Sequence, residues 1–482
     1  MRRPLAWAPI AVAAGLAMGL AGCMLGPDYR RPAVEVPTAW RISVEEATQA
    51  SDAAWWDRFG DPVLSQLVGT ALQNNEDLAI AVANVDQAFA QYGITRSALF
   101  PEVDAGASAQ RERLSETTAP LITPPGHQAF NDYRLNVSAS YELDIWGKLR
   151  RATEAARANL LASEEGRRTV VLTVVASVAS AYVQLRALDR QLDIARATTG
   201  SLGQAARLQQ VRFEGGATPE SDYRQAQSQF EAAAAQVPEL ERQVVRQENL
   251  ISVLLGANPG AIPRGTPIDQ LKFPDVPAGL PSALLERRPD IRQAEQNLVA
   301  ANADIGVAKA AYFPTVSLTA LFGVESSQVS DLFKGASKSW SFGAPVTVPI
   351  FTAGRIGSQV EQAEAGQREA LHFYRRSIIS AFADFEGALV DRAKFEQASE
   401  EQARNVEALE RFHDLALLRY KEGATIYLEV ANAEQSLLSA RLQLVNAQSQ
   451  LFQSYVNLYR AMGGGWVDAA EKLSARSMPR KD

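Results

Sequence analysis

The sequence has one cysteine, Cys23, and only three histidines in 482 residues. A single cysteine excludes a disulfide framework, and the dispersed His127, His372 and His413 lack metal-ligand spacing. The sequence also lacks a Gly-rich phosphate loop and a nucleophile elbow, so it predicts no enzyme, no cofactor and no metal site. The formal net charge of −7 argues against a nucleic-acid partner, which requires a basic face.

The first 22 residues have the features of a secretory signal peptide. A basic start is followed by an apolar run from Leu5 to Leu20 and by small residues before Cys23. Leu20-Ala-Gly-Cys23 resembles the lipobox of bacterial lipoproteins, where the cysteine receives a diacylglyceryl group and becomes the new N-terminus. An ordinary cleavage site beside a chance cysteine is the alternative. We expect a covalent lipid on Cys23, and Met24 after it implies sorting to the outer membrane.

Two octets repeat each other 207 residues apart. They are Val211-Arg-Phe-Glu-Gly-Gly-Ala-Thr218 and Leu418-Arg-Tyr-Lys-Glu-Gly-Ala-Thr425, and each lies between two long helical patterns. In both, a glycine (Gly216 or Gly423) stands where a helix could end in a left-handed residue. Each octet therefore predicts the turn of a helical hairpin.

The repetition extends beyond the octets. Leu99-Phe-Pro-Glu-Val103 corresponds to Tyr312-Phe-Pro-Thr-Val316, and Leu255-Gly256 corresponds to Met462-Gly463. This spacing is far longer than a solenoid repeat, so we infer two copies of one large unit. The predicted organisation is a signal peptide (1–22), an extended segment with short helices (23–74), a first repeat (75–257, β-hairpin about 102–145, tip near 211–222), a Pro/Gly-rich crossover (258–281), a second repeat (282–465, β-hairpin about 315–351, tip near 418–432) and a polar tail (466–482).

Four stretches alternate between apolar and polar residues. The longest is Tyr133 to Ile145, and the others run from Val103 to Ala109, from Val316 to Val324 and from Trp340 to Ile350. Such alternation predicts strands with one apolar and one wet face, and a tilted strand crosses a bilayer in about 9–11 residues. A soluble β-sandwich, or edge hairpins on a helical domain, are the alternatives.

Four strands in a membrane raise a closure problem. A bilayer tolerates no open sheet edge, and four strands cannot close into a barrel. Two copies would give eight strands with a filled lumen, whereas three copies give twelve and leave room for a channel. We therefore predict an α+β membrane protein in which a homotrimer forms a 12-stranded β-barrel.

The helical patterns predict long antiparallel hairpins. Two arms, from 147 to about 213 and from 354 to about 420, have roughly 65 residues each and would reach about 100 Å. Apolar residues in the first arm recur at steps of three and four, as in a coiled coil. The last arm has two apolar stripes, which suits a helix between two neighbours in a ring of helices. A buried helix of a soluble bundle has the same pattern.

Several long motifs resemble the outer membrane factor family, the TolC-like channels, and within it the NodT-type lipoproteins. They are Gly26-Pro-Asp-Tyr-Arg-Arg-Pro32, Leu280-Pro-Ser-Ala-Leu-Leu-Glu-Arg-Arg-Pro-Asp-Ile291, Ile305-Gly-Val-Ala-Lys-Ala-Ala-Tyr-Phe-Pro314 and Arg419-Tyr-Lys-Glu-Gly423. The resemblance implies a trimeric outer-membrane β-barrel continued by a periplasmic α-barrel. It also implies an exit duct that works with a periplasmic adaptor and an inner-membrane RND-type pump.

The resemblance also assigns roles at the tips. The two turns would contact the adaptor through Gly216, Ala217, Thr218, Gly423, Ala424 and Thr425. Leu428 matches a hydrophobic gate position, and Glu429 and Asn432 match positions where relatives often carry acidic rings. Asn432 departs from the usual aspartate, and Thr425 stands where some relatives have a latching arginine. Our hypothesis is a gate at Leu428 helped by Glu429; the alternative is that Leu428 packs inside its hairpin.

The runner-up function is a periplasmic coiled-coil lipoprotein, anchored to the outer membrane, with a structural or adaptor role and no pore. The four alternating strands distinguish the two functions, because an adaptor does not need two lipid-facing hairpins.

Overall fold

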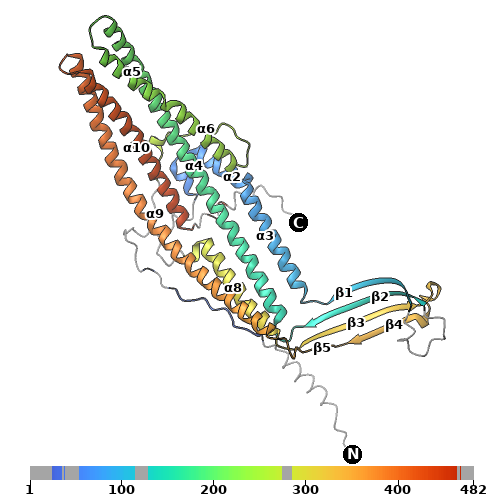
Figure 1. Ribbon diagram of the computed structural model, residues 1–482. Coiled ribbons are helices and arrows are strands. Elements are labelled where there is room, and N and C mark those ends of the chain that lie inside the picture. Colours follow the sequence, from blue (N-terminus) through green and yellow to red (C-terminus); the bar gives the residue numbers. More distant parts are fainter. Residues whose placement is uncertain are drawn as a thin grey trace, which may run out of the picture. The chain divides into compact units, whose positions relative to one another are not determined.

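The computed structural model describes residues 24–34, 37, 54–113, 129–273, 285–463, 467 and 470 (Figure 1). The signal peptide and Cys23 lie outside these residues. The chain divides into two compact units. Unit 1 comprises residues 1–33, 85–163 and 294–374, and unit 2 comprises residues 34–84, 164–293 and 375–482. Each unit therefore combines segments from both halves of the sequence.

An antiparallel sheet dominates unit 1 (Figure 1). Its strand order is β1-β2-β3-β4, and β5 also pairs with β3. Two short 3₁₀ turns, Val329–Asp331 and Gly335–Ser337, lie between β3 and β4. The strands are β1 (Glu102–Arg113), β2 (Ala129–Leu143), β3 (Thr315–Ser326), β4 (Lys338–Gly343) and β5 (Val346–Thr347).

The strand register builds one continuous apolar face. Ala105 lies opposite Val137, Val137 opposite Phe322, and Phe322 opposite Trp340. Side chains on this face are exposed: Val137 by 47%, Phe322 by 62% and Trp340 by 68%. The alternation in the sequence therefore predicts the first three strands and the shared apolar face correctly.

The last predicted strand is shorter than expected. Instead of one run from Trp340 to Ile350, the structure has β4, a break at Ala344-Pro345, and the two-residue β5. Pro345 has no N–H to donate to a neighbouring strand, and Pro349 ends the pairing soon after. The prediction of one continuous strand here is wrong.

Unit 1 also holds the junctions between strands and helices. Trp146 donates from Nε1 to the carbonyl oxygen of Pro314 at 2.8 Å, and its ring lies 4.7 Å from that of Phe313. Gly147 and Gly354 adopt positive φ just before long helices begin. The helices that enter this unit are α3 (Glu76–Ser97), α4 (Lys148–Glu214), α8 (Pro289–Ala310) and α9 (Arg355–Lys421).

The segment after Cys23 is fixed to unit 1. Leu25 donates its backbone N–H to Trp146 at 3.2 Å, and the buried Arg151 donates to the Leu25 carbonyl at 3.1 Å and to Asp28 at 2.7 Å. Gly26 has φ +91°, and a Cβ there would lie 2.5 Å from the Cα of Gly306. The chain is therefore held in place within two residues of Cys23.

Unit 2 contains the helical hairpins and their core. The residues of α4 that recur at steps of three and four are buried: Val171, Val174, Val178, Ala181, Leu185, Leu188 and Leu192. At the corresponding positions of α9, Ile378, Ala381, Phe385 and Ala388 are buried as well. One stretch of α4 is apolar enough to cross a membrane, but 72% of it is buried inside the protein. The other elements are a 3₁₀ turn (Trp55–Phe59), α2 (Pro62–Asn74), α5 (Glu220–Ala234), α6 (Gln236–Leu254), a 3₁₀ turn (Ile268–Gln270) and α10 (Tyr427–Ala461).

The two return arms differ. The return arm of the first hairpin is divided at Ala235 into α5 and α6, whereas α10 is continuous. Pro238 lies three residues after the division; it has no N–H for the carbonyl of Ala234, and its ring crowds that carbonyl. No proline interrupts α10.

The apolar face of the sheet yields a prediction. Val137→Arg should reduce barrel assembly, because arginine on a lipid-facing strand costs about 2–4 kcal/mol near the bilayer midplane. Heat-modifiable gel migration of the outer-membrane protein measures assembly. The matched control is Ser138→Arg, the neighbouring residue on the opposite face, which should assemble. Equal loss in both variants would contradict a lipid-facing role for the Val137 face.

Candidate functional site

Both hairpin turns end their helices in the same way. Gly216 and Gly423 have φ of +73° and +74°. The next residue, Ala217 or Ala424, donates its N–H to the carbonyl of Arg212 or Arg419, in each case at 2.8 Å. This is a Schellman motif, in which a left-handed glycine lets the chain satisfy the last carbonyls of a helix. Ala217 and Ala424 are exposed, and Thr218 and Thr425 are half-buried.

The two tips pack together through small side chains. One buried cluster draws residues from α4, α5, α9 and α10, and Phe230, Leu417 and Tyr420 pack against it. Alanines allow the four helices to approach closely. The buried members are Ala206, Ala226, Ala416, Tyr427, Val430, Ala431 and Ala433.

Tyr420 connects the two hairpins. Its hydroxyl accepts hydrogen bonds from Gln209 Nε2 at 2.6 Å and from Arg212 Nη1 at 2.8 Å, both on α4. Its ring packs edge-on against Tyr427 with centroids 5.6 Å apart. The end of α9 is thereby joined both to the first hairpin and to the start of α10. No role was predicted for Tyr420 from the sequence, although the Arg-aromatic pair Arg212-Phe213 recurs as Arg419-Tyr420.

The carboxylate of Glu429 is engaged within its own turn. Arg419 Nη1 donates to Glu429 Oε1 at 2.7 Å, and the hydroxyl of Thr425 donates to Glu429 Oε2. Thr425 thus contributes to fixing the Glu429 carboxylate. Because a cation lies beside Glu429, this carboxylate contributes less negative field than an unpaired acid would.

Leu428 and Asn432 lie on an exposed stripe of α10. Leu428 is 45% exposed, whereas its neighbours Tyr427 and Val430 belong to the buried cluster. Asn432 follows one helical turn later and is also exposed. The gate assignment of Leu428, Glu429 and Asn432 stays a prediction; in the single chain Leu428 and Asn432 are exposed.

Glu434, also on α10, has a half-buried carboxyl group. Burial raises the pKa of Glu434, and nearby His413 acts in the opposite direction. Burial, with Glu434 next in effect, raises the pKa of Tyr427 to about 12, and its buried hydroxyl has no hydrogen-bond partner among the described residues. The sequence offered a signal, since Glu434 interrupts the apolar stripe of Tyr427, Val430 and Leu437. In the described part of the chain, no cluster of His, Cys, Asp and Glu could hold a metal ion.

A sheet with an exposed apolar face and two packed helical hairpins define a membrane channel subunit. A sequence model of the outer membrane efflux protein family matches residues 67–257 and 280–464, and the chain belongs to this family. It is 36% identical to the toluene efflux pump outer membrane protein TtgF of Pseudomonas putida over 476 residues, 96% of this chain and 98% of the relative. It is 33% identical to the cation efflux system protein CusC of Escherichia coli, over 94% of this chain and 97% of the relative.

Solved structures agree with this assignment. The Campylobacter jejuni CmeC outer membrane channel matches with a TM-score of 0.87 at 28% identity, over 95% of this chain and 99% of that one. The open state of the Neisseria gonorrhoeae MtrE outer membrane channel matches with a TM-score of 0.83 at 32% identity, over 92% and 99%. The protein is therefore an outer-membrane efflux channel with the α+β channel fold, and the alternative without a pore is set aside.

The half-buried Glu434 yields a pH prediction. Its pKa is raised in the folded state, so protonation favours folding and the ionised form destabilises the fold. Glu434→Gln should therefore stabilise the tip at neutral pH. The difference from wild type should vanish at acid pH and grow as the pH rises above the ordinary carboxyl value of 4.5. Hydrogen exchange of α10 amides across this pH range measures the effect.

The control for charge is Glu422→Gln, which changes an exposed acid in the turn before α10. It should not reproduce a pH-dependent gain. A Glu434→Gln variant that exchanges like wild type at every pH would contradict the buried-carboxyl interpretation.

Proposed function

We propose that three copies of this chain close one water-filled duct, which passively carries substrates out of the cell without catalysis. The open edges support this proposal: in the described residues β1 pairs only with β2, and β4 and β5 pair only with β3. Lipid offers no hydrogen bonds to the backbone, so these edges must pair with other copies. Twelve strands leave a lumen wide enough for a channel.

The duct works with a periplasmic adaptor and an inner-membrane RND-type pump, which supplies the energy. The proposed adaptor-contacting residues are Gly216, Ala217, Thr218, Gly423, Ala424 and Thr425. Their support is geometric: both turns have the same Schellman motif, and each presents an exposed alanine. An adaptor that fits one turn can therefore fit the other.

The resting closure of the duct is proposed to be an apolar constriction at Leu428. The observation that carries this proposal is the 45% exposure of Leu428 on a helix whose neighbouring apolar residues are buried. Glu429 is engaged by Arg419, and Asn432 has no charge, so an apolar ring that excludes water suits these residues better than a ring of acids.

The gate proposal predicts the effect of one truncation. In cells without the pump partners, Leu428→Ala should admit large antibiotics and lower their inhibitory concentration several-fold, because the constriction widens. The control is Leu415→Ala, which truncates an exposed leucine on α9 and should leave exclusion intact. Unchanged exclusion by correctly assembled Leu428→Ala channels would remove the gate assignment.

A lipid on Cys23 is proposed as a second membrane anchor. Its support is the motif together with the position of Leu25, which is already bonded to Trp146 at a strand–helix junction. Each buried CH₂ of an acyl chain contributes about 0.8 kcal/mol, so acylation adds substantially to membrane attachment.

Lipidation is directly measurable. Cells grown with labelled palmitate should label the wild-type protein, and Cys23→Ala should lose the label entirely because the sequence has no other cysteine. Mass spectrometry of the mature N-terminus should show an acylated Cys23. An unmodified Cys23, or a mature chain that begins elsewhere, would contradict the assignment.

A further inference from the structure

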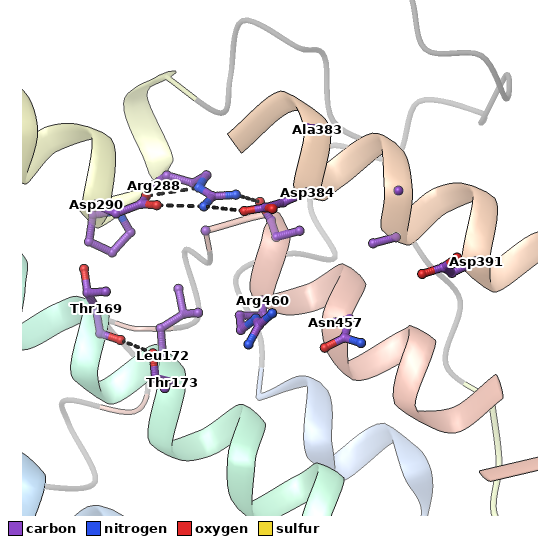
Figure 2. A pocket seen from close by; sticks show the side chains of 15 residues that line it. Thr169, Leu172, Thr173, Arg288, Asp290, Ala383, Asp384, Asp391, Asn457 and Arg460 are labelled. Carbon is purple, nitrogen blue, oxygen red and sulfur yellow. Dashed lines mark hydrogen bonds and ion pairs between the residues drawn. The ribbon is translucent and has the colours of Figure 1, made fainter. Parts of the chain in front are cut away.

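Residues 285–290, the described part of the motif Leu280-Pro-Ser-Ala-Leu-Leu-Glu-Arg-Arg-Pro-Asp290, belong neither to the tip nor to the sheet. Arg288 in this motif directly precedes α8 and is 9% exposed. Its guanidinium donates to both carboxylate oxygens of Asp290, at 3.0 and 2.7 Å, and to Asp384 on α9 at 3.2 Å. Figure 2 shows this group at the wall of a cavity of about 380 Å³.

Arg288 also binds two backbone carbonyls. Nη1 donates to Ala461 at 3.3 Å and to Ala381 at 3.5 Å. Ala461 is the last residue of α10, so its carbonyl has no partner within the helix, and a cation is favourable at a helix C-terminus. A single side chain therefore joins the start of α8, the middle of α9 and the end of α10.

The first repeat has an equivalent joint. Asn75 directly precedes α3, as Arg288 precedes α8, and it lies 213 residues earlier. Its Nδ2 donates to the carbonyl of Leu254 at 2.9 Å, and its Oδ1 accepts from the backbone N–H of Leu78 at 3.0 Å. Leu254 is the last residue of α6 and lies 207 residues before Ala461. The same contact thus occurs at the base of both hairpins.

A glycine completes each joint. Gly256 and Gly463 follow the two return helices with φ of +67° and +71°. A Cβ on Gly463 would lie 2.3 Å from Arg288 Cγ, and a Cβ on Gly256 would lie 2.0 Å from the carbonyl oxygen of Asn74. At each base, the chain that leaves the return helix therefore lies close to the residues just before α3 or α8.

We propose that Arg288 and Asn75 are positioning residues for the channel, each fixing the direction in which the return helix of its own hairpin leaves its base. Arg288 positions the second hairpin, which carries Leu428, and Asn75 positions the first. The second joint is ionic and the first is neutral. The two hairpins therefore respond differently to charge and to ionic strength.

Helix length makes such a joint effective. α10 has 35 residues and is about 52 Å long, so a rotation of about 5° at Ala461 moves the tip by about 5 Å. The side chains of Asp290 and Asp384 are 36% and 58% exposed, so solvent ions reach this joint. Salt that screens the ion pairs should loosen the second hairpin.

Two tip positions allow each hairpin to be observed separately. Ala217→Cys and Ala424→Cys place one spin label on the first or the second turn at equivalent exposed sites. Distances between copies in the purified full-length channel are measured by pulsed electron paramagnetic resonance. The parent protein without an added cysteine controls for labelling of Cys23.

Arg288→Met should widen the distance distribution of the Ala424 label by about 5 Å, the displacement expected for a lever of about 52 Å. The Ala217 distribution should widen less, because the buried cluster passes only part of the motion to the first tip. Asn75→Ala should do the reverse. Raising salt from about 0.1 to about 1 M shortens the Debye length from about 10 to about 3 Å. In the otherwise unsubstituted channel it should widen the Ala424 distribution more than the Ala217 distribution.

Two outcomes would overturn the proposal. One is equal widening of the Ala217 and Ala424 distance distributions in either variant, and the other is no widening in either variant or at high salt. If Arg288→Met does not assemble, the salt series and Arg288→Lys, which keeps the charge but loses the paired geometry, apply the same criterion. The consequence for closure rests on the proposed gate. Failure of Leu428→Ala to admit antibiotics would remove the gate and leave the label result standing, so the two failures are distinguishable.

Discussion

The structure depends on one constraint, which is that a polypeptide backbone in lipid must satisfy its own hydrogen bonds. The sheet presents an apolar face through Val137, Phe322 and Trp340, yet in the described residues β1 and the β4–β5 side each pair on one edge only. An exposed apolar face calls for a membrane, and open edges call for further copies of the chain. Together, these two requirements explain why one subunit of this channel cannot form a closed barrel by itself.

Duplication reuses backbone geometry while side chains diverge. The two turns share their glycines and their backbone hydrogen bonds. They differ where Phe213 of the first turn corresponds to Tyr420 of the second, because only the tyrosine has a hydroxyl that can accept hydrogen bonds from Gln209 and Arg212. The base joints follow the same rule, with asparagine in one and arginine in the other. The second hairpin is therefore the one whose attachments involve charge, both at its base and at its tip.

The features that could be predicted from the sequence are those that short segments determine by themselves. Alternation identified the strand faces, and Gly216 and Gly423 identified the turns, because period-two burial and positive φ are visible in single segments. Pro345 also carried a local signal, the missing N–H, which the alternation around it obscured. The partners of Arg288 and Tyr420 could not be read in this way. Asp384, Ala461 and Gln209 lie far away in the sequence, and only packing of the helices brings them together.

For the proposed gate at Leu428, the charges at the second tip suit an apolar closure better than an ionic one. A ring of acids that binds a cation needs carboxylates that are unpaired and aimed at one point. Here Glu429 already accepts from Arg419 and Thr425, and Asn432 offers an amide instead of a second acid. Removing Arg419 would free a carboxylate but would not restore the missing one. An exposed Leu428 needs no counter-ion, because water is excluded from a narrow apolar ring by the cost of hydrating it.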